Sequence, residues 1–83
     1  MGDIYMIGKA IKVMRNENNL KQSDLIKLLN IGQSTLSDYE NEKISIDFET
    51  IEKIAKICNY TIYFKNNKTG KEFEIKDLIR KDV

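Results

Sequence analysis

Residues 33–39, with the sequence QSTLSDY, concentrate side chains that can donate and accept hydrogen bonds. The amide, hydroxyl and carboxylate groups concerned belong to Gln33, Ser34, Ser37 and Asp38. Such groups recognise the polar surface of a partner when a helix leaves them exposed. A second short helical pattern precedes this stretch, with only residues 30–32 between them. Helices this short are marginal alone, so a larger scaffold must hold the pair.

The chain lacks the residue types that catalytic and metal sites need. It has no histidine and a single cysteine, Cys58, which excludes an internal disulfide and a zinc site built from His and Cys. There is no glycine-rich phosphate loop and no nucleophile next to a base, so we predict no enzymatic activity, no metal and no cofactor. Cys58 falls in an apolar helical pattern, and we expect it to be a small buried side chain.

Length and composition indicate one small globular domain. The chain has 83 residues, of which 41% are hydrophobic and 33% charged, and it contains no proline or tryptophan. No apolar run approaches the roughly 18–20 residues of a membrane span. The first residues lack the basic start and apolar core of a signal peptide. We therefore expect a cytoplasmic protein.

Charge is unevenly distributed although the formal net charge is only +1. Residues 9–21 carry four basic side chains and one acidic one, whereas residues 38–52 carry six acidic side chains and one basic one. A strongly basic chain would indicate nucleic acid as its partner. Here any surface for nucleic acid must be formed from selected positions.

Apolar spacing predicts four helices in the first 59 residues. The first carries Ile4, Ile7, Ile11 and Met14 on one face, starts after Asp3 as N-cap and ends near residue 17 or 18. The second covers 22–29 and the third 33–39, with Asn30 in the left-handed conformation between them. The fourth covers 48–58, with Asp47 as N-cap and Asn59 ending it. The side chains expected to face inward on helices two to four are Leu25, Leu28, Leu29, Leu36, Tyr39, Phe48, Ile51, Ile54, Ala55 and Cys58.

The pattern changes to alternation after residue 60. Residues 61–65 and 71–75 flank the turn-forming segment NNKTG, which predicts a β-hairpin. Its shared apolar face consists of Ile62, Phe64, Phe73 and Ile75. Two arrangements stay open: the hairpin packs on its own helices, or it joins a second copy of the chain. Residues 76–81 are expected to add one helical turn through Leu78 and Ile79.

Residues 7–62 resemble the helix-turn-helix domains of phage repressor and Cro type, the Xre-like family. The matching segments are IGKAI with Arg15, LKQSDL at 20–25, NIGQSTLSDYEN at 30–41 and TIEKIA at 50–55. The resemblance implies a mainly α, compact four-helix, lambda-repressor-like domain with a C-terminal hairpin added. We divide it into a DNA-binding part, 1–59, and a hairpin and tail, 60–83, that belong to the same domain and serve dimerisation.

The resemblance also implies which residues contact DNA. Residues 33–39 become the recognition helix, with Gln33, Ser34, Ser37 and Asp38 as base-reading residues. Gln suits the N6/N7 edge of adenine, Ser donates or accepts, and Asp accepts from cytosine N4. Phosphate contacts fall to Gln22, Thr35, Asn41 and Lys43. Arg15 and Glu40 form a structural ion pair. The chain departs from the family at Lys21 and Gly32, in place of capping Ser or Thr, and at Ile26, in place of a small residue.

Three functions follow from this resemblance and from the residues. The first is a dimeric transcriptional regulator, a repressor that binds double-stranded DNA at an inverted repeat. The second is an antitoxin, which binds its operator in the same way and holds a toxin through the hairpin, the tail or the acidic segment. The third is a protein-interaction module that has lost DNA binding, which the low net charge and the acidic residues near 33–39 favour.

Overall fold

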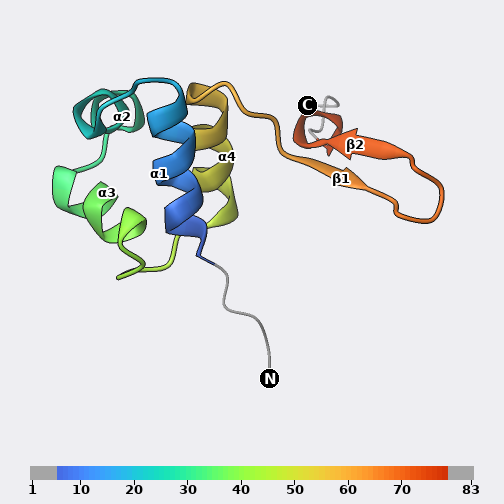
Figure 1. Cartoon of the computed structure of the whole chain (residues 1–83), viewed down its shortest axis with the longest axis horizontal. Helices are drawn as coiled ribbons and strands as arrows, with labels where there is room; N and C mark the ends of the chain where they lie inside the picture. The colour runs from blue at the N-terminus through green and yellow to red at the C-terminus, as the bar shows by residue number, and fades with distance from the viewer. Residues whose placement is uncertain (1–5, 79–83) are drawn as a thin grey trace, which may run out of the picture.

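The computed structural model describes residues 6–78. Within that range the chain forms four α-helices, a two-stranded antiparallel sheet and one 3-10 turn. The elements are α1 (Ile7–Glu17), α2 (Gln22–Leu29), α3 (Gln33–Glu40), α4 (Phe48–Ile57), β1 (Tyr63–Lys65), β2 (Glu72–Glu74) and η1 (Ile75–Leu78). The helices form one body and the hairpin extends from it on the side of α4 (Figure 1). This confirms the predicted fold class.

One fully buried side chain from each helix meets at the centre of the helical body. Ile11, Leu25, Leu36 and Ile54 are all 0% exposed, and Cys58 is buried among them. Burying each aliphatic side chain stabilises the fold by about 1.5–3 kcal/mol. The buried cluster ends at residue 58, so α1 to α4 position α3 without help from the hairpin. The expectation that Cys58 is a core side chain is confirmed.

Asparagine residues end two of the helices as predicted. Asn30 after α2 and Asn59 after α4 have φ values of 57° and 64°, in the left-handed region that Asn tolerates better than most residues. Asp47 caps α4 by accepting a hydrogen bond from the Thr50 N–H at 3.3 Å. These short-range signals therefore set the lengths of α2 and α4.

Three expectations about the helices are wrong. Helix α1 begins at Ile7 with Met6 at the N-cap position, so it starts later than predicted; Asp3 and Ile4 lie outside the described residues. Leu28 is 65% exposed, because α2 presents Leu25 and Leu29 to the core instead. Phe48 is 51% exposed, because it is the first residue of α4 and its ring faces the hairpin.

The hairpin has the predicted turn and face. Phe64 pairs with Phe73 across the two strands, and their rings stack with centroids 5.3 Å apart. Both strands are shorter than predicted, so Ile62 precedes β1 and Ile75 is the first residue of η1. In the turn, the Asn66 side-chain oxygen accepts from the Lys68 N–H at 2.9 Å, and Gly70 supplies the positive φ of 82°.

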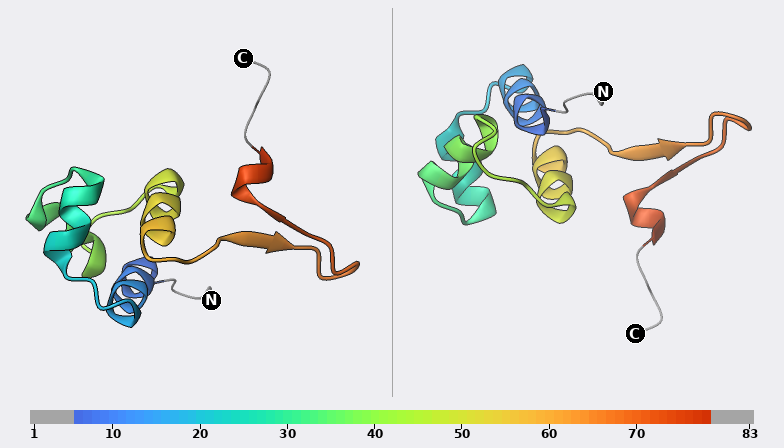
Figure 2. Two further views of the ribbon diagram at one scale, coloured as in Figure 1. Left: turned by 90° about the horizontal axis from the view of Figure 1, so that it is seen from above. Right: turned by 90° about the horizontal axis from the view of Figure 1, so that it is seen from below.

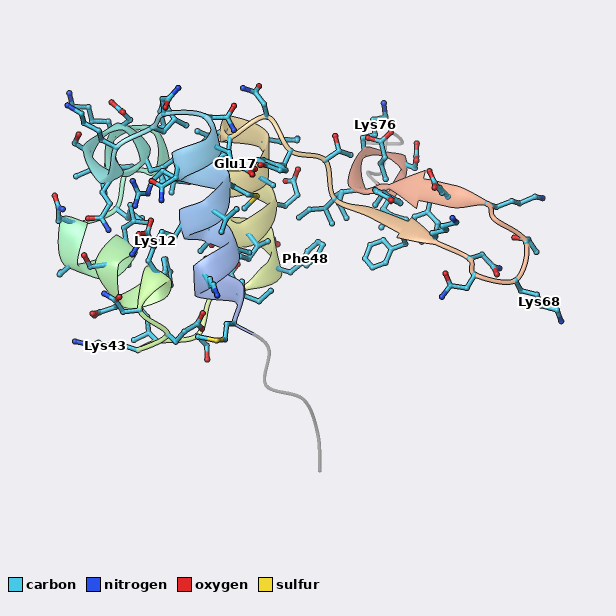
Figure 3. The ribbon with its side chains drawn as sticks, viewed as in Figure 1. Lys12, Glu17, Lys43, Phe48, Lys68 and Lys76 are labelled. Atoms are coloured by element: carbon cyan, nitrogen blue, oxygen red, sulfur yellow. The ribbon has the colours of Figure 1, made fainter. Side chains whose placement is uncertain are left out.

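The hairpin contacts the helices at its base and leaves its far end free of them (Figure 2). Ile62 and Ile75 are half-buried there, and the Phe48 and Phe64 rings lie 6.5 Å apart. Beyond this contact, Lys68 marks the tip, far from the helical body (Figure 3). The hairpin therefore does not form a layer over α1 to α4. The predicted turn in the tail is a 3-10 turn that ends at Leu78; Ile79 and Lys81 lie outside the described residues.

No helix within residues 6–78 is both long enough and apolar enough to cross a membrane.

Candidate nucleic-acid interface

Helix α3 presents its predicted base-reading residues from a two-turn helix held against α1 and α2. Gln33 and Ser34 are exposed, and Ser37 and Asp38 are half-buried. Leu36 anchors the opposite side in the core. Gly32, at the N-cap position, has no side chain to cap the helix, so the approach to the first turn is unobstructed. The start of α3 is therefore the accessible end of the candidate interface.

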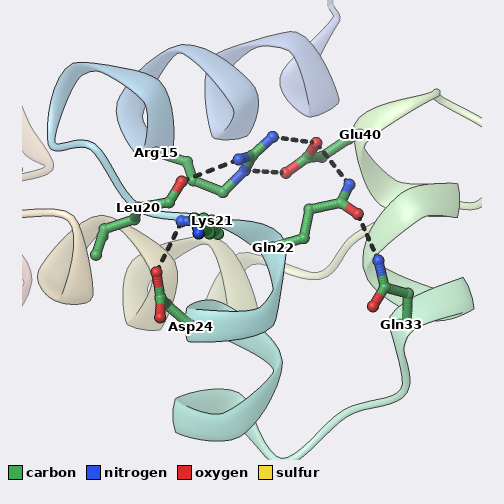
Figure 4. A network of polar contacts seen from close by, with 7 residues as sticks. All are labelled: Arg15, Leu20, Lys21, Gln22, Asp24, Gln33 and Glu40. Atoms are coloured by element: carbon green, nitrogen blue, oxygen red, sulfur yellow. Dashed lines mark hydrogen bonds and ion pairs between the residues drawn. The ribbon is translucent and has the colours of Figure 1, made fainter.

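A polar network fixes Gln33 to the two helices behind it (Figure 4). Gln33 Nε2 donates to Gln22 Oε1 at 2.9 Å, and Gln22 Nε2 donates to Glu40 Oε1 at 3.1 Å. Arg15 completes the network with two hydrogen bonds to the Glu40 carboxylate, at 2.8 and 3.0 Å. A planar, paired guanidinium–carboxylate contact of this kind restricts both side chains. The network thus links α1, α2 and both ends of α3.

The buried ion pair also changes the charge of the surface. Arg15 and Glu40 are 9% and 7% exposed, so Glu40 is neutralised inside the protein. Arg15 Nη1 further donates to the Leu20 carbonyl at 2.9 Å, which holds the turn before α2. The predicted structural pair of Arg15 and Glu40 is confirmed. Of the acidic residues in α3, only Asp38 is left near the reading surface.

Gln22 was predicted as a phosphate contact, and the structure gives it two protein partners. Its amide bridges Gln33 and Glu40, so it positions the predicted base reader directly. In this arrangement Gln33 retains its side-chain oxygen and one N–H, the two groups that a bidentate contact to adenine requires. Sequence patterns identified both glutamines but not their hydrogen bond, because the residues are eleven positions apart and meet only through the turn.

The other predicted phosphate contacts surround the same helix. Thr35 is half-buried on α3, whereas Asn41 and Lys43 are exposed in the turn that follows. Lys43 extends from the C-terminal end of α3 (Figure 3), and its N–H donates to the Asp38 carbonyl at 2.8 Å. Their contacts with DNA stay a prediction. The hairpin residues Ile62, Phe64, Phe73 and Ile75 lie away from α3 and belong to a different surface.

Lys21, at the N-cap position of α2, lacks the hydroxyl of a capping Ser or Thr, and the carboxylate of Asp24 in the first turn of α2 bonds back to it. Asp24 Oδ2 accepts from the Lys21 N–H at 2.8 Å, which is half of a capping box. Ile26 is accommodated partly buried against the core. These departures from the family pattern therefore leave α2 and α3 in place.

Within residues 6–78, no cluster of three acidic or cysteine side chains is arranged to hold a metal ion. Burial raises the pKa of the Cys58 thiol, which favours the unreactive neutral form.

Residues 11–64 match a family described as helix-turn-helix. The chain belongs to this helix-turn-helix family. The match confirms the resemblance to phage repressor and Cro-type domains, and it runs from Ile11 in α1 to Phe64 in β1.

Three relatives share this part of the chain. The ImmF control region 10 kDa protein of Bacillus phage phi105 is 36% identical over 59 residues, 71% of this chain and 66% of that protein. Antitoxin PezA of Streptococcus pneumoniae is 37% identical over 54 residues, 65% of this chain and 34% of that protein. An uncharacterized HTH-type transcriptional regulator of Methanocaldococcus jannaschii, MJ1545, is 46% identical over 43 residues, 48% of this chain and 18% of that protein. No solved structure matches the chain significantly.

Proposed function

We propose that this helix-turn-helix protein is a sequence-specific regulator of transcription that binds double-stranded DNA through α3. The observation that carries the proposal is the fixed position of Gln33, whose amide is held by Gln22 and indirectly by Arg15 and Glu40. An amide oriented in advance loses less conformational freedom on binding a base edge. The Bacillus phage relative is named for a control region, which agrees with this function.

In this proposal the residues divide into two groups. Gln33, Ser34, Ser37 and Asp38 contact base edges in the major groove, each good pair giving about 1–3 kcal/mol of discrimination. Gln22, Thr35, Asn41 and Lys43 contact phosphates and set the register on the duplex. The protein acts as a homodimer, whose two copies of α3 lie about 34 Å apart and bind an inverted repeat. Repression follows when the bound dimer blocks polymerase.

A titration of the purified protein against the DNA upstream of its own gene, called control-region DNA below, tests this function. Binding is followed by fluorescence anisotropy at several salt concentrations, with a scrambled duplex of equal length for comparison. We expect a preference of about 10³-fold or more for the control-region DNA. Gln33→Ala should lower that preference by about 10-fold or more while keeping the salt dependence, because it removes a base contact and no charge.

Two further variants sharpen the titration. Asn67→Ala truncates an exposed amide in the hairpin turn, far from α3, and should bind like wild type. Lys43→Gln should weaken binding to both duplexes equally and reduce the salt slope by about one. Absence of binding to either duplex at about 50 mM salt contradicts the function and favours a protein-interaction module, because phosphate attraction is strongest at low salt.

The relationship to antitoxin PezA favours a second candidate, an antitoxin that binds its operator and also a toxin protein. The hairpin, the tail and the acidic residues at the start of α4, Asp47, Glu49 and Glu52, are the surfaces left for a toxin when α3 and the turn after it are on DNA. Co-expression with the product of a neighbouring gene tests this candidate. A stoichiometric complex that survives size-exclusion chromatography supports it, and separate elution contradicts it.

A further inference from the structure

An apolar groove lies where the hairpin leaves the helical body. Its cavity of about 490 Å³ is bounded by α1, by the first half of α4 and by the segment before β1. The side chains that matter here are Ile7, Ala10, Met14, Phe48, Ile51 and Ile62. Ile7 is 43% exposed and Phe48 51% exposed. An open apolar surface of this kind costs free energy in water until a partner covers it.

The hairpin continues this apolar surface away from the helices. Phe64 is 45% exposed and Phe73 46% exposed, although their rings stack on each other. Phe64 also stacks on Phe48, at the edge of the groove, with a centroid distance of 6.5 Å. The groove and the exposed aromatic face of the hairpin are therefore continuous at Phe48 and Phe64, and the hairpin projects from the helical body on the side of α4 (Figure 1).

Charge is complementary between the two ends of this surface. The hairpin turn, residues 65–71, carries three lysines and no acidic residue. The start of α4, beside the groove, carries Asp47 and Glu49, whereas Glu52 one turn later is already paired with Lys56 at 3.3 Å. Within one chain these groups are apart, because Lys68 points away from the helices at the far end of the hairpin (Figure 3). The basic turn can therefore meet an acidic start of α4 only in another molecule.

We propose that the groove receives the hairpin of a second copy of this chain, in a reciprocal exchange. Phe64 and Phe73 of each chain pack over the groove of the other, and the lysine-rich turn lies toward the acidic start of α4. Both surfaces occur on every chain, so a twofold dimer forms the contact twice. Each strand has only three residues, so pairing two hairpins edge to edge would form few main-chain hydrogen bonds. Packing the aromatic face of the hairpin into the groove would instead bury two large apolar rings. This inference rests on the proposed homodimer and specifies its contact.

A complementation experiment distinguishes exchange from hairpin-to-hairpin pairing. Ala10→Glu places a charge in the groove, and Phe73→Glu places one on the hairpin. By sedimentation equilibrium each variant alone should dimerise at least about 30-fold more weakly than wild type, since both of its contacts are damaged. An equimolar mixture should recover dimers, because the intact hairpin of Ala10→Glu fits the intact groove of Phe73→Glu and the two lesions share one contact.

The control is Val13→Glu, which adds the same charge to an exposed apolar residue of α1 outside the groove and should dimerise like wild type. Normal dimerisation of Ala10→Glu, or no recovery in the mixture, overturns the exchange while the homodimer stands. If wild type is a monomer at every concentration, both the exchange and the homodimer are overturned. The DNA titration then tests DNA binding independently of dimerisation. If Ala10→Glu loses helical circular dichroism, Ile7→Glu at the exposed start of α1 replaces it.

Discussion

At the scale of single residues, Gly8 decides how closely α1 approaches the end of α3. Gly8 is buried within α1, and a Cβ there would overlap the Tyr39 carbonyl and lie 2.7 Å from Glu42 Oε1. Because the Tyr39 carbonyl belongs to the backbone, the overlap can be relieved only if the backbone of α1 or of α3 shifts. The sequence showed a glycine inside a helical pattern, a known sign of close packing, but it did not show what the glycine packs against.

We predict that Gly8→Ala destabilises the protein by about 1–2 kcal/mol, although alanine is the better helix former. The corresponding fall in Tm is roughly 5–15 °C for a domain of this size, measured by circular dichroism. Gly32→Ala is the comparison, because the nearest atom to its Cβ is Thr35 Oγ1 at 3.9 Å; it meets no clash and should lower the Tm less, through the loss of a glycine N-cap alone. Equal Tm values for the two variants would show that α1 and α3 tolerate a wider separation.

Glu42 shows what single-residue patterns could not predict. Its φ is 62°, unusual for a glutamate, and its carboxylate accepts from the Lys9 N–H at 3.2 Å. A carboxylate at a helix N-terminus is favoured by the free N–H groups and the helix dipole. The start of α1 is therefore capped from 33 residues away, which local sequence cannot reveal.

At the scale of elements, Asp47 sets the start of α4 and adds a pH dependence. The hydrogen bond from the Thr50 side chain lowers the pKa of the Asp47 carboxyl below its ordinary value of 3.8. A lowered folded-state pKa means that the cap stabilises α4 above pH 3.8 and loses this effect as the pH falls through the folded-state pKa. We predict that Asp47→Ala lowers the Tm at neutral pH, because α4 loses its N-cap acceptor.

Thermal unfolding between pH 2 and pH 7 checks this prediction. The Tm difference between wild type and Asp47→Ala should shrink as the pH drops below 3.8. Glu17→Ala removes an exposed carboxylate from the last turn of α1, where negative charge is unfavourable, so it should not lower the Tm. A difference that is constant across the whole pH range contradicts the role of the charged carboxylate.

Element boundaries were largely predictable because local chemistry sets them. The limits of α2 and the caps at Asp47, Asn30 and Asn59 came directly from residue types. Which side chains of a helix face the core was less predictable, as Phe48 and Leu28 show. That depends on how the helices cross and on where the hairpin lies. The candidate site shares this division: periodicity and resemblance indicated Gln22 and Gln33, whereas their shared hydrogen bond depends on tertiary structure.

At the scale of the whole molecule, the buried core stabilises the helical body, and the hairpin lies outside that core. Among residues 6–78, all fully buried side chains lie between Ile11 and Cys58, and the hairpin contacts the helices near its base. A chain that ends after Ile62 retains Tyr60, which packs against the core. We predict that this truncated chain still unfolds cooperatively, with a Tm within a few degrees of the full-length Phe73→Glu variant, which likewise lacks the stabilisation that dimerisation gives.

The truncated chain should nevertheless bind the inverted repeat about 100-fold or more weakly than the full chain. Two linked recognition helices gain affinity because the second contact becomes intramolecular, and the truncated chain lacks the hairpin that links them. Its affinity for a single half-site should equal that of the full-length Phe73→Glu variant, which keeps the hairpin but loses the dimer contact. If the truncated chain fails to fold, residues 63–83 contribute to the folding unit, and the prediction that the helical body folds without the hairpin is wrong. If it binds the repeat as tightly as the full chain, the helical body dimerises by another surface and the hairpin serves a different partner.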